Sequence, residues 1–183
     1  MSLTVKEAYN GGGLIVGREG EEYILCDGSW IIRIKEEAFE KEYKAAVIEH
    51  VGDLPRDGEL VRKSKKFGNS EMSEASKAIL TLEDIERACV PADITSVYID
   101  IAGKLCRMVQ CNDRNVLVKE ELIVLAEEVK GEGMEGPCCI AEKEFQLYWS
   151  SRTCKYTALA MNIHQETKEW KALERLRAVD LRR

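Results

Sequence analysis

The chain has 183 residues, of which 45% are hydrophobic and 33% charged, and its formal net charge is −6. This balance excludes an intrinsically disordered chain and predicts a folded unit of about one domain. The negative charge excludes a general attraction to nucleic acid, so any such binding would need a local basic patch.

No apolar run approaches the ~20 residues that cross a bilayer, and the segment around Lys6 and Glu7 lacks the pattern of a secretory signal. The sequence therefore predicts a cytoplasmic protein that is not inserted in a membrane. Its seven cysteines are odd in number and scattered, and no two close Cys-x-x-Cys pairs occur among them. We expect free, buried thiols, with no disulfide framework, no metal site and no cofactor.

The first half of the chain predicts a hairpin, a helix and a long loop. Asp27 and Gly28 lie between two apolar segments and tolerate the positive φ of a tight turn, so two paired strands are expected around them. From Glu36 the apolar residues recur at helical spacing, which predicts an amphipathic helix that ends near Gly52. Residues 53 to 72 are polar and interrupted by proline and glycine, and there we expect a loop with one short strand.

A second helix is predicted to start near Thr81 and to stop before Pro91, because proline disfavours helical geometry in the residue before it. Alternating apolar residues then predict a hairpin that turns at Ala102 and Gly103. A strand at residues 116 to 118 leads straight into a helix, for which the expected apolar face is Leu122, Leu125, Ala126 and Val129.

The last part of the chain predicts one more hairpin and a helical tail. Phe145, Leu147 and Trp149 are expected on one face of the first strand, with a turn near Ser151 and Arg152. The expected apolar face of the return strand is Leu159, Met161 and Ile163. Residues 165 to 183 are then expected to be helical.

Two segments of the chain look alike. Residues 30 to 47 and residues 115 to 129 each predict an apolar strand that continues without a loop into a helix beginning Lys-Glu-Glu. Acidic side chains are favourable in the first turn of a helix because they face its partial positive charge. The alternative is a chance match in a chain rich in lysine and glutamate.

The second segment and the stretch after it, over residues 116 to 163, resemble the DNA polymerase sliding clamps. In that family an apolar strand runs directly into a helix and then into a strand meander. The resemblance implies an α+β fold of antiparallel sheets with helices packed on one face, built from two repeated strand-helix-sheet units. It places a first unit at residues 1 to 95, a second at residues 96 to 164, and a C-terminal helix at residues 165 to 183.

The resemblance also implies DNA or a replication protein as a partner and a homo-oligomer as the assembly. This sequence departs from a ring-forming clamp in two respects. It is long enough for about one domain, and both repeat helices contain more glutamate than lysine, whereas helices that line a DNA channel should be basic. A clamp-like fold with another binding role therefore fits the residues better than a working ring.

Two basic patches are the candidate nucleic-acid sites. The first is a group of four cations with one aromatic residue in the polar loop, namely Arg62, Lys63, Lys65, Lys66 and Phe67. Such a patch can neutralise phosphates and stack on a base, or it can be an ordinary solvated loop. The second patch is in the C-terminal helix, with Arg175, Arg177, Arg182 and Arg183 as its arginines. The apolar edge of that helix indicates docking on its own sheet or on a partner.

No pattern of catalytic residues stands out. Gly12 and Gly17 have the spacing of a phosphate-binding loop, but the Lys-Ser/Thr pair that would hold phosphate and magnesium is missing. Cys154 and His164 lie ten residues apart on or near one strand, too far to form a nucleophile and base. We therefore expect a non-enzymatic protein of DNA replication or of a mobile element that binds DNA or a replication partner. The alternatives are an enzyme with dispersed site residues and a self-associating structural or regulatory protein.

Overall fold

The computed structural model describes residues 2–71, 90–112, 114–129, 133–140, 146–161, 167–176 and 179–181. Within these residues the helices are α1 (Ser2–Asn10), α2 (Lys41–Val51), α5 (Glu120–Glu128) and α6 (Lys168–Leu176). The first strands are β1 (Leu14–Glu19), β2 (Glu22–Cys26), β3 (Trp30–Lys35), β4 (Leu60–Ser64) and β5 (Gly68–Glu71). The remaining strands are β6 (Val90–Ile101), β7 (Lys104–Cys111), β8 (Arg114–Lys119), β9 (Glu135–Ile140), β10 (Gln146–Ser150) and β11 (Cys154–Leu159).

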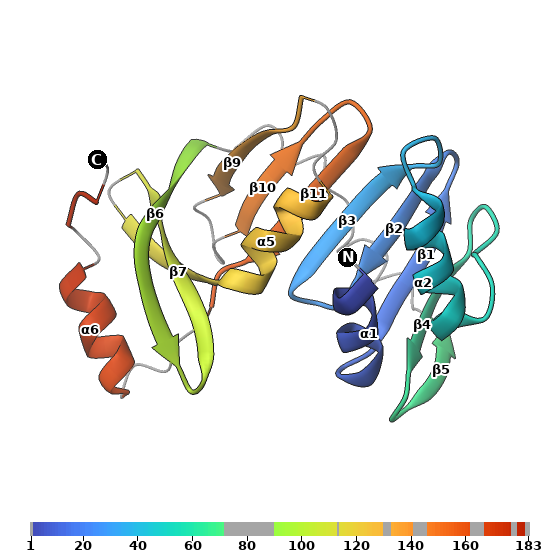
Figure 1. Ribbon diagram of the computed structural model, residues 1–183, viewed down its shortest axis with the longest axis horizontal. Helices are drawn as coiled ribbons and strands as arrows, with labels where there is room; N and C mark the ends of the chain where they lie inside the picture. Colours follow the sequence, from blue (N-terminus) through green and yellow to red (C-terminus); the bar gives the residue numbers. More distant parts are fainter. Residues whose placement is uncertain are drawn as a thin grey trace.

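The described strands form one antiparallel sheet in the order β5-β4-β1-β2-β3-β11-β10-β9-β6-β7-β8 (Figure 1). The pairing of β3 with β11 joins strands that are more than a hundred residues apart in the chain, with register pairs from Trp30↔Ala158 to Ile34↔Cys154. The protein is therefore an α+β protein with a large antiparallel sheet, as the sequence predicts.

One hydrophobic core lies between the sheet and the helices α1, α2 and α5. It includes Val5 of α1, Val47 of α2 and Leu125 of α5, all at most 1% exposed. The inward residues of β1, β3 and β11 pack into the same cluster. Three helices thus share one face of the sheet, in agreement with the expected arrangement.

The helix α6 packs on the opposite face, against β6, β7 and β8 (Figure 1). Its Leu173 is 4% exposed and contacts a second, smaller cluster that contains Cys106, Met108 and Leu117. Because β7 and β8 are covered by α5 on one face and by α6 on the other, both faces contain buried apolar residues. The expected docking of this helix on its own sheet is confirmed.

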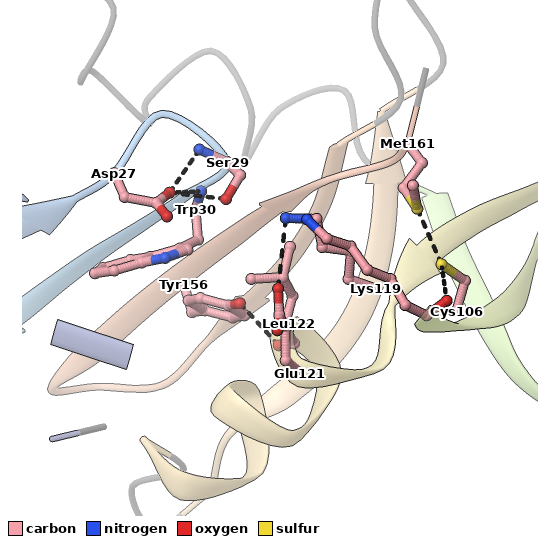
Figure 2. A network of polar contacts seen from close by, with 10 residues as sticks. Asp27, Ser29, Trp30, Cys106, Lys119, Glu121, Leu122, Tyr156 and Met161 are labelled. Carbon is pink, nitrogen blue, oxygen red and sulfur yellow. Dashed lines mark hydrogen bonds and ion pairs between the residues drawn. The ribbon is translucent and has the colours of Figure 1, made fainter. Parts of the chain in front are cut away.

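The hairpin at Asp27 and Gly28 is confirmed. Asp27 Oδ1 accepts hydrogen bonds from the backbone N–H groups of Ser29 and Trp30 and from the Ser29 hydroxyl, which closes the turn (Figure 2). The hairpin at Ala102 and Gly103 is also confirmed, because β6 ends at Ile101 and β7 begins at Lys104. Both turns contain residues with positive φ, as tight hairpins require.

The two strand-helix junctions differ from each other, so the predicted passage without a loop is correct for only one of them. The strand β8 passes directly into α5, as expected. After β3, however, residues 36–39 form a turn, and α2 begins only at Lys41. The turn places Phe39, 3% exposed, against Tyr23 with ring centroids 5.0 Å apart. Burial of this aromatic ring in the core accounts for the interruption.

Three other predictions from the sequence need correction. The polar segment after residue 53 contains the expected short strand as β4, but β5 pairs with it to form a hairpin in place of a long loop. The N-terminal helix α1 was not expected. The tail is helical only over α6, since residues 179–181 are not helical. In the return strand of the last hairpin, the inward residues are Cys154, Tyr156 and Ala158. The predicted face at Leu159 and Met161 is wrong because Leu147 pairs with Ala158 and Trp149 with Tyr156, so the even-numbered residues of β11 share the inward face.

Leu147 and Trp149 are buried as predicted, at 0% and 5% exposed. The helix predicted from Thr81, together with Phe145 and Ile163, lies outside the described residues. In the described part of the chain, no helix has both the length and the apolar character that a membrane span requires. The division into units at residues 95 and 164 stays a prediction.

Candidate nucleic-acid interface

The first basic patch forms the β4–β5 hairpin, in which Ser64 pairs with Gly68. Ser64 is buried, and its hydroxyl oxygen accepts hydrogen bonds from the backbone N–H groups of Lys66 and Phe67 at 3.2 and 3.4 Å. Lys65 donates its backbone N–H to the carbonyl oxygen of Tyr9 in α1 at 3.0 Å. These bonds hold the base of the turn and leave its side chains at the tip of the hairpin.

The side chain of Phe67 extends into solvent. It is 78% exposed, more than any other large hydrophobic residue among those described. Lys65 and Lys66 beside it are exposed as well. An aromatic face that projects among cations is the combination that stacks on bases while the cations contact the phosphates. The exposed ring is thus accessible to another molecule.

A pocket of about 290 Å³ lies at the hairpin and is lined by Arg62, Ser64, Phe67 and Gly68. The Arg62 guanidinium donates a hydrogen bond to the carbonyl oxygen of Gly12, which fixes the cation beside the pocket. The approach is close at Gly13, which has φ +118°, because a Cβ there would lie 2.9 Å from Arg62 Nε. The glycine run before β1 therefore positions Arg62: Gly12 accepts its hydrogen bond, and Gly13 leaves room for its side chain.

The charges of the hairpin are mostly positive. Residues 60 to 71 contain four cations and one acidic residue, Glu71. Arg62 is exposed on the strand, whereas Lys63 is partly buried on the side of α1, opposite Leu14. The ion pairs in the described part of the chain involve none of these four cations. Their charges thus remain available to a phosphate backbone.

The second basic patch is the solvent side of α6. Lys168, Lys171 and Arg175 are exposed and lie three and four residues apart, so they share one side of the helix. Leu173 faces the sheet from the other side. The remaining predicted arginines of this patch, Arg177, Arg182 and Arg183, lie outside the described residues.

Two buried amides of the sheet hold the end of α6. Asn115, 2% exposed, donates from Nδ2 to the carbonyl oxygens of Leu176 and Val179. Gln110, 3% exposed, accepts the backbone N–H of Leu181 at 2.8 Å. These bonds satisfy backbone groups that a helix end leaves free. The helix and its basic side chains are thereby fixed relative to β7 and β8.

The structure does not bring the two patches together. The hairpin lies at one end of the sheet, whereas α6 covers β6, β7 and β8 at the other end (Figure 1). The residues that sequence reasoning missed are Ser64, which closes the turn, and Gly12 and Gly13, which hold Arg62. The run of three glycines indicated a close approach of another chain segment, but the sequence did not show that this segment is β4.

The polar contacts at the centre of the sheet are structural. The Tyr156 hydroxyl, fully buried, donates to the carbonyl oxygen of Leu122 in α5 at 2.8 Å (Figure 2). Lys119 and Glu121 form an ion pair at 3.4 Å across the β8–α5 junction. The Cys106 thiol contacts the sulfur of Met161 at 3.0 Å inside the cluster under α6. These contacts connect elements that pack together and do not converge on a pocket.

The described cysteines have the character of core residues. The six within the described residues form no disulfide with one another, and among them only Cys138 is more than 9% exposed. Burial raises the pKa of Cys26 to about 11 and that of Cys154 to about 12. Both thiols are therefore protonated at neutral pH and poorly suited to nucleophilic attack. Within the described residues, no group of three histidine, cysteine or acidic side chains could hold a metal ion.

No protein-family model matches the sequence, and no curated protein matches it either. By structure, the chain is similar to the beta chain of DNA polymerase III from Streptococcus pneumoniae TIGR4, with 11% identity and a TM-score of 0.38. It is also similar to the beta subunit from DNA polymerase of Streptococcus pyogenes, with 11% identity and a TM-score of 0.36.

These alignments cover 92% of this chain, but the chain spans only 64% and 63% of the two solved chains. Both solved chains belong to the sliding clamps that the sequence resembles. The likeness is one of general arrangement, and the TM-scores are too low to place the chain in that family.

Proposed function

We propose that the protein binds single-stranded nucleic acid through the β4–β5 hairpin. The observation that carries this proposal is the exposure of Phe67 among Arg62, Lys65 and Lys66, beside a pocket to which both Phe67 and Arg62 contribute. A base can stack on the exposed ring, and the cations can contact the phosphates on either side of it.

Single strands fit this hairpin better than duplex. The bases of a duplex are already stacked on one another, whereas a single strand offers a free aromatic face to Phe67. The hairpin also lacks the helix that commonly enters the major groove, because its tip is a turn of three residues. We therefore assign the hairpin a role in binding, without a chemical step on the nucleic acid.

Because the whole protein is negatively charged, binding must depend on short-range contacts at the hairpin. The net charge of −6 repels a polyanion at long range, so the affinity depends on close contacts with the hairpin. Such contacts release counterions, so the binding constant should fall as the salt concentration rises. In a plot of log K against log salt concentration, each phosphate contact should add about −0.7 to the slope.

The test is a salt titration of binding to a labelled strand of about 15 nucleotides, within the range of known single-strand sites. DNA and RNA of one sequence are compared by fluorescence anisotropy. The double variant K65A/K66A should reduce the salt slope by about 1.4, because two phosphate contacts are lost. The variant F67A should weaken binding roughly tenfold and leave the slope unchanged, since it removes stacking and no charge.

The matched control is K6A/K41A, which removes two exposed lysines from α1 and α2. This variant should bind like the wild-type protein. If K65A/K66A and K6A/K41A lost the same affinity, the loss would be explained by the change in net charge alone. That result would contradict the proposal. Binding of the wild type that does not change with salt would contradict it too.

A further inference from the structure

The pocket of the β4–β5 hairpin has one buried residue in its lining. Ser64 is 4% exposed, whereas the other three lining residues are exposed. The volume of about 290 Å³ is at the lower end of the range for ligand pockets. The pocket is therefore of a size for one small group, with Ser64 as its floor.

The hydroxyl of Ser64 can only donate to a ligand. Its oxygen already accepts the backbone N–H groups of Lys66 and Phe67, and these two bonds occupy both of its lone pairs. Its proton has no acceptor among the described residues. A ligand oxygen in the pocket would satisfy this buried donor.

The guanidinium of Arg62, at the side of the pocket, also offers donors alone. It has five N–H groups and no acceptor, and one N–H group is bound to the carbonyl oxygen of Gly12. That bond and the room at Gly13 fix the guanidinium before a ligand arrives, so binding does not have to immobilise it. The polar side chains of the pocket therefore match a ligand that is rich in acceptors, and the charge of Arg62 favours an anion.

The group of a nucleic acid that matches this pocket best is a phosphate at the end of a strand. Phosphate oxygens accept hydrogen bonds, and the planar guanidinium can bind two of them at once. A phosphate monoester carries about −1.5 to −2 charges at pH 7 and has three strong acceptor oxygens. A phosphate inside a strand carries a single negative charge and brings the chain in on both sides. The small pocket with Ser64 as its floor therefore favours the terminal group.

We propose that the pocket binds the terminal phosphate of a single strand, through Arg62 and the Ser64 hydroxyl, while the base at that end stacks on Phe67. This inference rests on the proposed function of the hairpin and adds the part of the strand that is recognised. Lys65 and Lys66 then contact the phosphates that follow. The 5′ phosphate and the 3′ phosphate share the same chemistry, and the experiment distinguishes them.

The experiment compares three strands of one sequence, each about 8 nucleotides long, which is within the range of known single-strand sites. One has no terminal phosphate, one has a 5′ phosphate and one has a 3′ phosphate. Each competes with an internally labelled strand in a fluorescence anisotropy assay, so that its own ends stay free. One of the two phosphorylated strands should bind roughly tenfold more tightly than the unmodified strand, as hydrogen bonds to a charged group allow. Equal binding of all three strands would overturn the proposal.

The variant R62A should bring the preferred strand close to the affinity of the unmodified strand. K63A is the matched control, because it removes the same charge from the next residue of β4. The side chain of Lys63 lies on the other side of the sheet, towards α1, so K63A should keep the tenfold preference. If K63A lost as much of the preference as R62A, net charge would explain the preference and the pocket assignment would be wrong.

The outcomes separate this proposal from the proposed function. K65A/K66A should weaken all three strands by a similar factor and leave the preference for the terminal phosphate unchanged. If it weakens them all but the wild type shows no such preference, the pocket assignment is wrong and the hairpin site stands. If K65A/K66A binds every strand like the wild type, the hairpin site itself fails.

Discussion

At the scale of single residues, the buried thiols make the stability of the protein depend on pH. Burial is the largest cause of the raised pKa of Cys26, about 11 in the folded protein against an ordinary value of 9.0. The unfolded chain loses this proton at lower pH than the folded one. The resulting stability is present in full below pH 9 and is lost as the pH rises toward 11.

We therefore expect the free energy of unfolding to fall as the pH rises from 9 to 11, the interval between the two values for Cys26. The variant C26A should lose stability less steeply over this interval, by about 1.4 kcal/mol per pH unit, because it lacks one titrating thiol. Urea titrations at several pH values measure the slope. Below pH 8 the two proteins should show parallel behaviour, and equal slopes above pH 9 would contradict the assignment.

At the scale of elements, α6 is held by a small core of its own and by two amides. Leu173 is its most buried described residue, at 4% exposed, and it packs on Cys106, Met108 and Leu117. These three side chains lie outside the main core under α1, α2 and α5. Loss of Leu173 should therefore release α6 without unfolding the rest of the sheet.

The variant L173A should cost about 2 to 4 kcal/mol of the docking free energy, as large-to-small changes in cores do. Limited trypsin digestion should then cut first at Lys168, Lys171 or Arg175, while the sheet stays intact. E174A, which changes an exposed residue of the same helix and leaves every trypsin site in place, serves as the control and should resist digestion as the wild type does. Equal protection of α6 in L173A and the wild type would show that the two amides suffice to hold it.

At the scale of the whole molecule, the pairing of β3 with β11 and the continuous core predict a single cooperative transition for the sheet. Trp30 of β3 and Trp149 of β10 are both buried in this core, on the two sides of the β3–β11 pairing. The double variants W30F/W170F and W149F/W170F each keep one of the three tryptophans. Their fluorescence should change at the same urea concentration, and two separate midpoints would contradict the prediction.

The sequence alone predicted features that depend on neighbouring residues. The turn at Asp27 and Gly28, the helix that follows Lys119 and the buried thiols all follow from local spacing, turn chemistry and composition. The start of α2 was predicted five residues too early, because the interruption depends on the contact of Phe39 with Tyr23, sixteen residues before it. The hairpin of β4 and β5 was predicted mainly as a loop, because its polar residues show no strand periodicity.

Local patterns in the sequence predict the α+β class, most of the strands after residue 90, and the residues of the two basic patches. The long-range pairing of the strands places these patches at opposite ends of one sheet. The physical reason is that strand order and facing depend on pairings such as Ile34 with Cys154, which local propensity does not encode. Where a charge is placed on the surface is therefore a property of the fold, while its presence is a property of the sequence.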